Sequence, residues 1–168
     1  MRNIEWKGRL LDPLGAEQLC RELGACFVAE LEQRDTYYDV PSGRLKRRDC
    51  AGRPTEWIEY FRPDETKVRA SDYRLLDPGE AARLHPPGSL AERVVVEKRR
   101  RLYLHGEVRI HRDRVTGLGD CFELEALVNE RQDEAAARHA LDALLAEFKP
   151  VLGAALAGSY SDLLIERR

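Results

Sequence analysis

Residues 94–115, with the sequence VVVEKRRRLYLHGEVRIHRDRV, carry ten formally charged side chains in a segment that has the pattern of a β-hairpin. Valine-rich runs and residues that alternate in polarity predict strands, and Gly106 tolerates the positive φ of a tight hairpin turn. Sheets usually bury apolar side chains on at least one face, and unsolvated charge is costly. This segment therefore limits the fold to a sheet with one solvent-exposed face or a barrel with a charged interior.

A two-residue loop formed by His105 and Gly106 predicts the register of the hairpin, with Arg100 opposite His111. One face of the hairpin then carries five charged or titratable side chains, namely Lys98, Arg100, Arg109, His111 and Asp113. Taken alone, this face fits the solvent-facing side of an ordinary sheet.

Charged residues spaced two apart recur on other predicted strands. The further sets are Asn3/Glu5/Lys7, Arg44/Lys46/Arg48 and Glu123/Glu125. In a closed barrel these faces point either outward to water or inward to a shared lumen, where each unpaired charge costs several kcal/mol. A polyphosphate with a divalent cation pairs with both signs, because phosphate oxygens bind Arg and Lys while carboxylates bind Mg²⁺ or Mn²⁺.

Short strands dominate the predicted secondary structure. Strands are expected over residues 3–10, 25–40, 44–50, 57–63, 71–77, 94–104, 107–115 and 121–128, and helices over 14–23 and 131–148. The Pro- and Gly-rich residues 77–89 are expected to form a loop, and residues 156–166 one last strand. Because 168 residues fit one domain, the pattern predicts a single α+β domain built on an antiparallel sheet or barrel.

Composition argues against several other classes of protein. Lys and Arg number 28 against 30 Asp and Glu, a formal net charge of -2, so we expect no nucleic-acid partner. The four cysteines form no CxxC pair, which argues against zinc and redox motifs. The sequence also lacks an apolar run long enough for a signal peptide or a membrane span, so we expect a cytoplasmic protein without a membrane partner.

Motifs spread along nearly the whole chain resemble, in the same order, those of the CYTH superfamily. This superfamily of triphosphate tunnel metalloenzymes includes class IV adenylyl cyclases and thiamine triphosphatases. The matching segments are NIEWK (3–7), RLK (44–46), YFRPD (60–64), VEKRRRLY (96–103), RIHRDRV (109–115), GLGDCFELE (117–125) and AGSYSDLL (157–164).

The resemblance implies a closed eight-stranded antiparallel barrel around a hydrophilic tunnel, with helices packed outside. It implies metal ligands at Glu5, Asp113, Glu123 and Glu125, with Mg²⁺ or Mn²⁺ as the cofactor. It implies triphosphate-binding residues at Lys7, Arg44, Lys46, Arg62, Lys98, Arg100 and Arg109. The expected catalytic residues among these are Lys98, Arg100 and Asp113.

One position departs from the family pattern, because Asn3 stands where the ExExK motif has its first acid. An amide can donate to phosphate or hold a metal-bound water, but it supplies no negative charge, so the number of metal ions stays open. The resemblance favours conversion of ATP to cyclic AMP and pyrophosphate. Hydrolysis of tripolyphosphate or thiamine triphosphate is the alternative, and Asn3 motivates a third, a module that binds polyphosphate or a nucleotide without turnover. The oligomeric state, including a homodimer, is left open.

Overall fold

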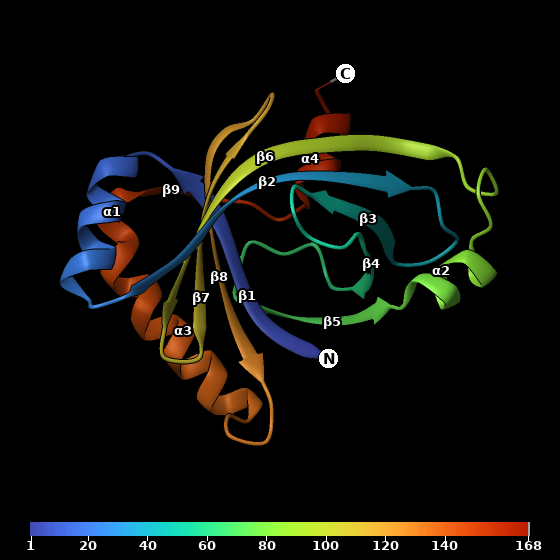
Figure 1. Ribbon diagram of the computed structural model, residues 1–168. Helices are drawn as coiled ribbons and strands as arrows, with labels where there is room; N and C mark the ends of the chain where they lie inside the picture. The colour runs from blue at the N-terminus through green and yellow to red at the C-terminus, as the bar shows by residue number, and fades with distance from the viewer. Residues whose placement is uncertain (168) are drawn as a thin grey trace.

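The computed structural model describes residues 1–167, which form nine β-strands and four α-helices (Figure 1). The strands are β1 (Arg2–Leu10), β2 (Cys26–Tyr38), β3 (Arg44–Cys50), β4 (Glu56–Phe61), β5 (Arg69–Leu76), β6 (Glu92–His105), β7 (Val108–Val115), β8 (Gly119–Val128) and β9 (Leu152–Ala155). The helices are α1 (Pro13–Glu22), α2 (Pro78–Leu84), α3 (Glu134–Phe148) and α4 (Tyr160–Ile165), and a 3₁₀ turn η1 (Lys149–Val151) follows α3.

Strands β1 to β8 close into an antiparallel barrel. The order around the ring is β1-β5-β4-β3-β2-β6-β7-β8, and β1 completes the ring because it pairs with both β5 and β8. Strand β9 lies outside the ring and pairs with the end of β1, where Gly8 faces Ala155. The expected eight-stranded antiparallel barrel with helices packed outside is confirmed.

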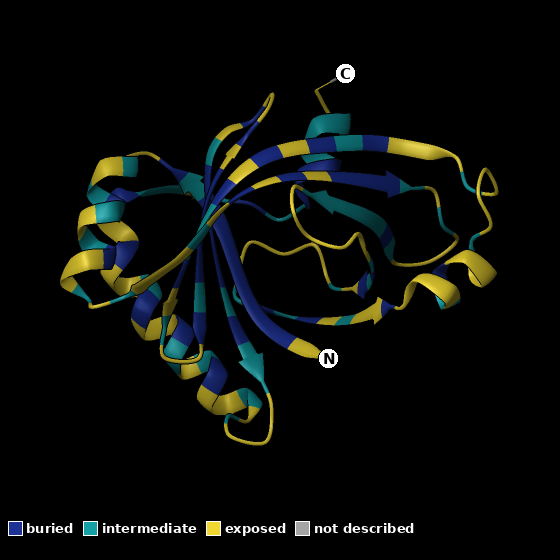
Figure 2. Ribbon diagram, viewed as in Figure 1, coloured by how far each residue is buried: buried dark blue, intermediate teal, exposed yellow. Residues whose placement is uncertain are grey.

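The two faces of the barrel wall differ in character, as β1 shows. Its inward side chains, Asn3, Glu5 and Lys7, line an internal cavity, whereas Ile4 and Trp6 belong to an apolar cluster on the outer side. Strict alternation along a strand produces this division. The main apolar core therefore lies outside the barrel, between strands β1, β7 and β8 and the helices α1 and α3. Figure 2 shows the buried face of α3 along this contact.

The hairpin between β6 and β7 turns one residue later than the sequence predicts. Its strands end at His105, paired with Val108, so the loop residues are Gly106, with φ 57°, and Glu107. Arg100 consequently faces Asp113 instead of His111. A shift of two residues in the pairing keeps every side chain on its predicted face, because the side-chain period is two.

The prediction of a final strand over residues 156–166 is wrong, because most of this segment forms helix α4. A capping box starts the helix: the Ser159 side chain accepts a hydrogen bond from the Asp162 N–H, and the Asp162 carboxylate accepts one from the Ser159 N–H. This local pattern outweighs the weak strand signal of the tail. Helix α4 packs beside β6 at one end of the barrel, where Tyr160 joins an apolar cluster with Val94 and Val96.

The remaining helices follow ordinary start signals. Residues 77–89 contain helix α2, which begins after Asp77, whose side chain accepts a hydrogen bond from the Glu80 N–H at 2.9 Å. Helix α3 starts at Glu134, three residues later than predicted, after the N-cap Asp133. In residues 1–167 no helix has both the length and the apolar character that crossing a bilayer requires.

Replacing Leu141 by alanine tests whether the outer cluster is the main source of stability. Leu141 is fully buried in this cluster, so we expect Leu141→Ala to lower the free energy of unfolding by about 2–5 kcal/mol in urea denaturation. The exposed neighbour provides the control: Asp142→Ala should change it by less than about 0.5 kcal/mol. Equal losses in both variants would contradict this placement of the core.

Candidate active site: a charged tunnel

The barrel encloses a cavity of about 460 Å³ whose lining is rich in charged side chains. Acidic and basic residues from β1, β3, β6, β7 and β8 face it, as do Ser159 and Tyr160 at the start of α4. Around the ring, β2 lies four strands from β1 in either direction, and β3 lies four strands from β8. The groups on β2 and β3 therefore form a wall opposite the groups on β1 and β8.

The wall made by β2, β3 and β6 carries three cations around one anion, Asp35. Both oxygens of Asp35 accept from Arg48, at 2.7 Å from Nε and 2.8 Å from Nη2. Lys98 Nζ donates to Asp35 Oδ2 at 2.7 Å, and Lys46 Nζ donates to the same oxygen at 3.2 Å. Asp35 is 0% exposed, so the three cations cover it completely.

The pKa values on this wall follow from burial and from the excess of cations. Burial alone would raise the pKa of Asp35, but Lys46, Lys98 and Arg48 hold it well below its usual range. Burial, and after it the charge of Arg48, lower the pKa of Lys46 to about 7 against the opposing effect of Asp35. Burial likewise lowers the pKa of Lys98 to about 8 against the opposing effect of Asp35. The pKa values of both lysines therefore lie within about one unit of neutral pH.

The other wall is organised by Glu123 and Asp113. Arg100 donates to both oxygens of Asp113, at 2.7 and 2.6 Å, and to Glu123 at 2.9 Å. Lys7 Nζ lies 2.9 Å from the other oxygen of Glu123, and Tyr160 Oη donates to Asp113 at 3.0 Å. Burial would raise the pKa of Asp113, but Arg100 lowers it, so the carboxylate stays ionised.

Three side chains near the open part of this wall are arranged as metal ligands would be. One possible ligand atom from each of His111, Glu123 and Glu125 lies within 4.8 Å of the others. Glu5 is the β1 neighbour of Glu125 in the β1–β8 pairing. The buried Oδ1 of Asn3 has no hydrogen-bond partner among the described residues, which leaves an oxygen free for a metal-bound water or a substrate donor. This donor set fits a hard divalent cation.

Glu5 itself forms an ion-paired cluster with two arginines. Arg62 Nη1 and Arg69 Nε donate to the same Glu5 oxygen at 2.8 and 3.1 Å. Arg62 and Arg69 are almost fully buried, so this cluster lies deep in the wall. A metal ion bound by Glu5 would have to compete with both guanidinium groups.

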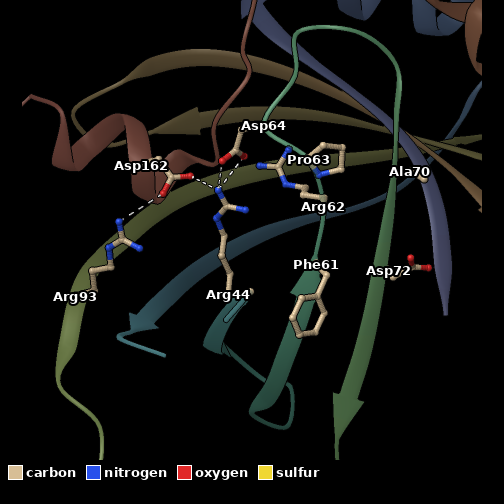
Figure 3. Close-up of a pocket in the computed structure, with 10 residues that line it drawn as sticks. Arg44, Phe61, Arg62, Pro63, Asp64, Ala70, Asp72, Arg93 and Asp162 are labelled. Carbon is tan, nitrogen blue, oxygen red and sulfur yellow. Dashed lines mark hydrogen bonds and ion pairs between the residues drawn. The ribbon is translucent and has the colours of Figure 1, made fainter. Parts of the chain in front are cut away.

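Arg44 does not line the tunnel and instead lies with Arg62 in a second pocket at the rim of the barrel (Figure 3). There it donates to Asp64 at 2.7 Å and to Asp162 of α4 at 2.8 Å, and Arg93 of β6 approaches Asp162 at 3.9 Å. The central arginine of this rim pocket is already paired with two acids. Arg62 lines both spaces.

Nearly all the side chains that the sequence predicts for the site come together in one tunnel. Those that line the cavity are Glu5, Lys7, Lys46, Arg62, Lys98, Arg100, Arg109, Glu123 and Glu125. Asp113 lies directly behind Arg100, and Arg109 is partly exposed and 3.8 Å from Glu125. Their roles in binding and catalysis stay predictions.

The structure adds residues that were not predicted for the site. Asp35, Arg69 and Tyr160 make short polar contacts with predicted residues. Arg48 pairs with Asp35. The alternation of Gln33, Asp35 and Tyr37 on a predicted strand could have indicated Asp35, since it matches the pattern used elsewhere. Tyr160 lies in the AGSYSDLL segment that resembles the family, but its contact with the site could not be predicted, because its position depends on where α4 packs.

A comparison with family models matches the CYTH domain over residues 1–150. The chain belongs to the CYTH family. The match includes every predicted site residue, from Glu5 to Glu125. A search of curated proteins finds no match.

Solved structures of low sequence identity share the fold. The PH1012 protein of Pyrococcus horikoshii is 22% identical, with a TM-score of 0.71 over 96% of this chain and 98% of that one. A candidate adenylate cyclase of Vibrio parahaemolyticus is 18% identical, with a TM-score of 0.74 over 97% of each chain. HpAC1 of Hippeastrum, a candidate adenylyl cyclase with a dominant triphosphatase activity, is 18% identical, with a TM-score of 0.61 over 98% of this chain and 95% of that one.

Removing Arg100 should destabilise the protein because it leaves Asp113 and Glu123 buried with fewer partners. We expect Arg100→Met to lower the free energy of unfolding by about 3–5 kcal/mol in urea denaturation. Arg99, the adjacent residue on the outer face of β6, forms an exposed pair with Glu32. Arg99→Met should therefore cost less than about 1 kcal/mol, and comparable losses would contradict the inward assignment.

The low pKa values of Lys46 and Lys98 predict a pH-dependent stability. Both lysines release protons on folding, because their pKa values fall from 10.5 to about 7 and about 8. The unfolded chain thus binds more protons above pH 7, so the free energy of unfolding should rise between pH 7 and 8.5, on the order of 1 kcal/mol per pH unit. Thermal melts of the wild type and of Lys46→Met at several pH values measure this rise. Stability should increase less steeply with pH in the variant than in the wild type, and an equal or steeper increase would contradict the prediction.

Proposed function

We propose that the protein is a metal-dependent enzyme that cleaves a triphosphate bound in the tunnel. The observation that carries the proposal is the division of the lumen, with the cations around Asp35 on one wall and His111, Glu123 and Glu125 on the other. Phosphate oxygens pair with the first group and a divalent cation with the second. Membership of the CYTH family supports the same assignment, since its members bind triphosphates.

The proposed binding residues act by charge and position. Lys46, Lys98 and Arg100 would bind the phosphate chain, because buried guanidinium and ammonium groups interact strongly with oxyanions. Lys7, Arg62 and Arg109 would bind it from the neighbouring strands. Arg44 is a weaker candidate, since reaching the phosphates would require it to leave Asp64 and Asp162.

Catalysis in this proposal depends on holding the substrate in line while its charge is stabilised. Lys98 and Arg100 would stabilise the charge that develops on the leaving phosphate oxygens. Asp113 would keep Arg100 oriented, because it accepts from two guanidinium nitrogens at 2.7 and 2.6 Å. These roles need no movement of the barrel.

Glu123, Glu125 and Glu5 are the residues proposed to hold Mg²⁺ or Mn²⁺, with His111 and Asn3 beside them. When bound, such an ion neutralises phosphate charge and polarises the phosphorus–oxygen bond. Asp113 is less accessible than the other proposed ligands, because it is 1% exposed and paired with Arg100 and Tyr160.

The tunnel lining favours an organic triphosphate such as ATP. Besides its charges, the cavity is lined by Leu31, Ile58, Leu75 and Leu102. A purely inorganic polyphosphate gains nothing from aliphatic side chains, whereas a nucleoside buries apolar surface against them. Cyclisation of ATP to cyclic AMP and pyrophosphate, which the resemblance to class IV adenylyl cyclases favours, is the first proposed reaction. Hydrolysis of the triphosphate is the second, as the activity of HpAC1 shows that a similar fold carries it.

Separating the products identifies the reaction. Purified protein is incubated with ATP, tripolyphosphate and thiamine triphosphate, with Mg²⁺, Mn²⁺ or EDTA, and the products are resolved by chromatography. We expect cyclic AMP and pyrophosphate from ATP only with a divalent ion, whereas orthophosphate would identify a hydrolase. Tight binding without product under every condition would replace the enzyme with a binding module.

A further inference from the structure

Asp35 is the most completely paired carboxylate on the basic wall, and the proposed reaction gives it no part. It accepts four hydrogen bonds from three cations, at 2.7 to 3.2 Å, and is fully buried beneath them. Two of these cations, Lys46 and Arg48, keep slightly exposed side chains, at 13% and 14%, on the cavity side. A substrate in the tunnel would therefore touch the cations and not Asp35.

We propose that Asp35 is a positioning residue that holds Lys46, Arg48 and Lys98 together, in charged form, as the receptor for the phosphate chain. The inference rests on the proposed function, since it assumes that a triphosphate occupies the tunnel. Its physical basis is that three cations on two strands repel one another unless an anion lies among them. When all three cations are protonated, one carboxylate among them leaves a net charge of about +2 facing the lumen.

The Asp35 carboxylate also affects how far Lys46 and Lys98 are protonated, and therefore the positive charge of this wall. With Asp35 in place, the pKa of Lys46 is about 7 and that of Lys98 about 8, because burial and neighbouring cations lower both values. Removing an opposite charge within hydrogen-bonding distance lowers a lysine pKa by a further 1–3 units or so. Without Asp35 both lysines would be largely neutral at pH 7–8 and would bind phosphate weakly.

Other groups around the two lysines stay the same when Asp35 is changed. The charged and titratable groups that face Lys46 and Lys98 from the surrounding elements are Tyr37 on β2, Arg48 on β3, Tyr60 on β4, Arg100 on β6, Asp113 on β7 and Tyr160 on α4. Asp113 is already paired with Arg100, so it cannot replace Asp35 as the partner of Lys98.

The test measures tripolyphosphate binding by isothermal titration calorimetry between pH 5 and 9, with EDTA and again with Mg²⁺. For Asp35→Asn we expect the pH above which affinity falls to move at least about one unit towards acid, with about a tenfold or greater loss of affinity at pH 8. Asp35→Glu, which keeps the charge, should restore the wild-type pH profile. A purely structural role would instead weaken binding equally at every pH.

A second pair of variants covers the case in which Asp35→Asn does not fold. Arg48→Met retains the carboxylate with its two lysines, and Arg48→Met/Asp35→Asn removes the closest ion pair as a unit. The pH above which affinity for tripolyphosphate falls should be lower in the double variant than in Arg48→Met. An equal pH in both variants would overturn the role of Asp35. Wild-type protein that binds neither tripolyphosphate nor ATP, with or without Mg²⁺, would contradict the proposed function itself, which separates the two failures.

Discussion

The pairing of opposite charges inside the barrel is the interaction on which the rest of the structure depends. Arg100 with Asp113, Lys98 with Asp35 and Arg62 with Glu5 each lie within 2.8 Å and are shielded from water. Isolated charges at these depths would cost more than a barrel of this size can offset, whereas paired and hydrogen-bonded charges are tolerated. Because the lumen is polar, the apolar core has to form outside, which explains why α1 and α3 pack on the wall.

The same pairing preorganises the side chains of the tunnel for an anionic ligand. Lys46, Lys98 and Arg100, which would contact the phosphate chain, are already held by neighbouring carboxylates, so these side chains lose little rotamer entropy on binding. The resident carboxylates and a bound anion then share the same cations. Asp35 and Glu123 differ in their surroundings. Asp35 lies beneath its cations, whereas Glu123 also lies beside His111 and Glu125, the other possible metal ligands.

Much of the barrel could be predicted from the sequence, because alternation fixes which face each side chain occupies. Lys98, Arg100 and Arg109 lie on the expected face even though the hairpin pairing is shifted by two residues. Contacts between distant segments could not be predicted in this way. The pairing of Arg44 with Asp162 depends on where α4 packs. The start of α4 is set by the capping box of Ser159 and Asp162, a signal that was not recognised in the sequence.

Closure of the ring has a consequence for how the protein is made. Strand β1 lies between β5 and β8, and its partners on β8 are more than a hundred residues away in the sequence. During synthesis β1 therefore lacks its β8 partners, among them the Glu123 that pairs with Lys7, until residues 119–128 have left the ribosome. Such distant pairing makes folding slow, and the unclosed intermediate presents open strand edges that a chaperone would recognise.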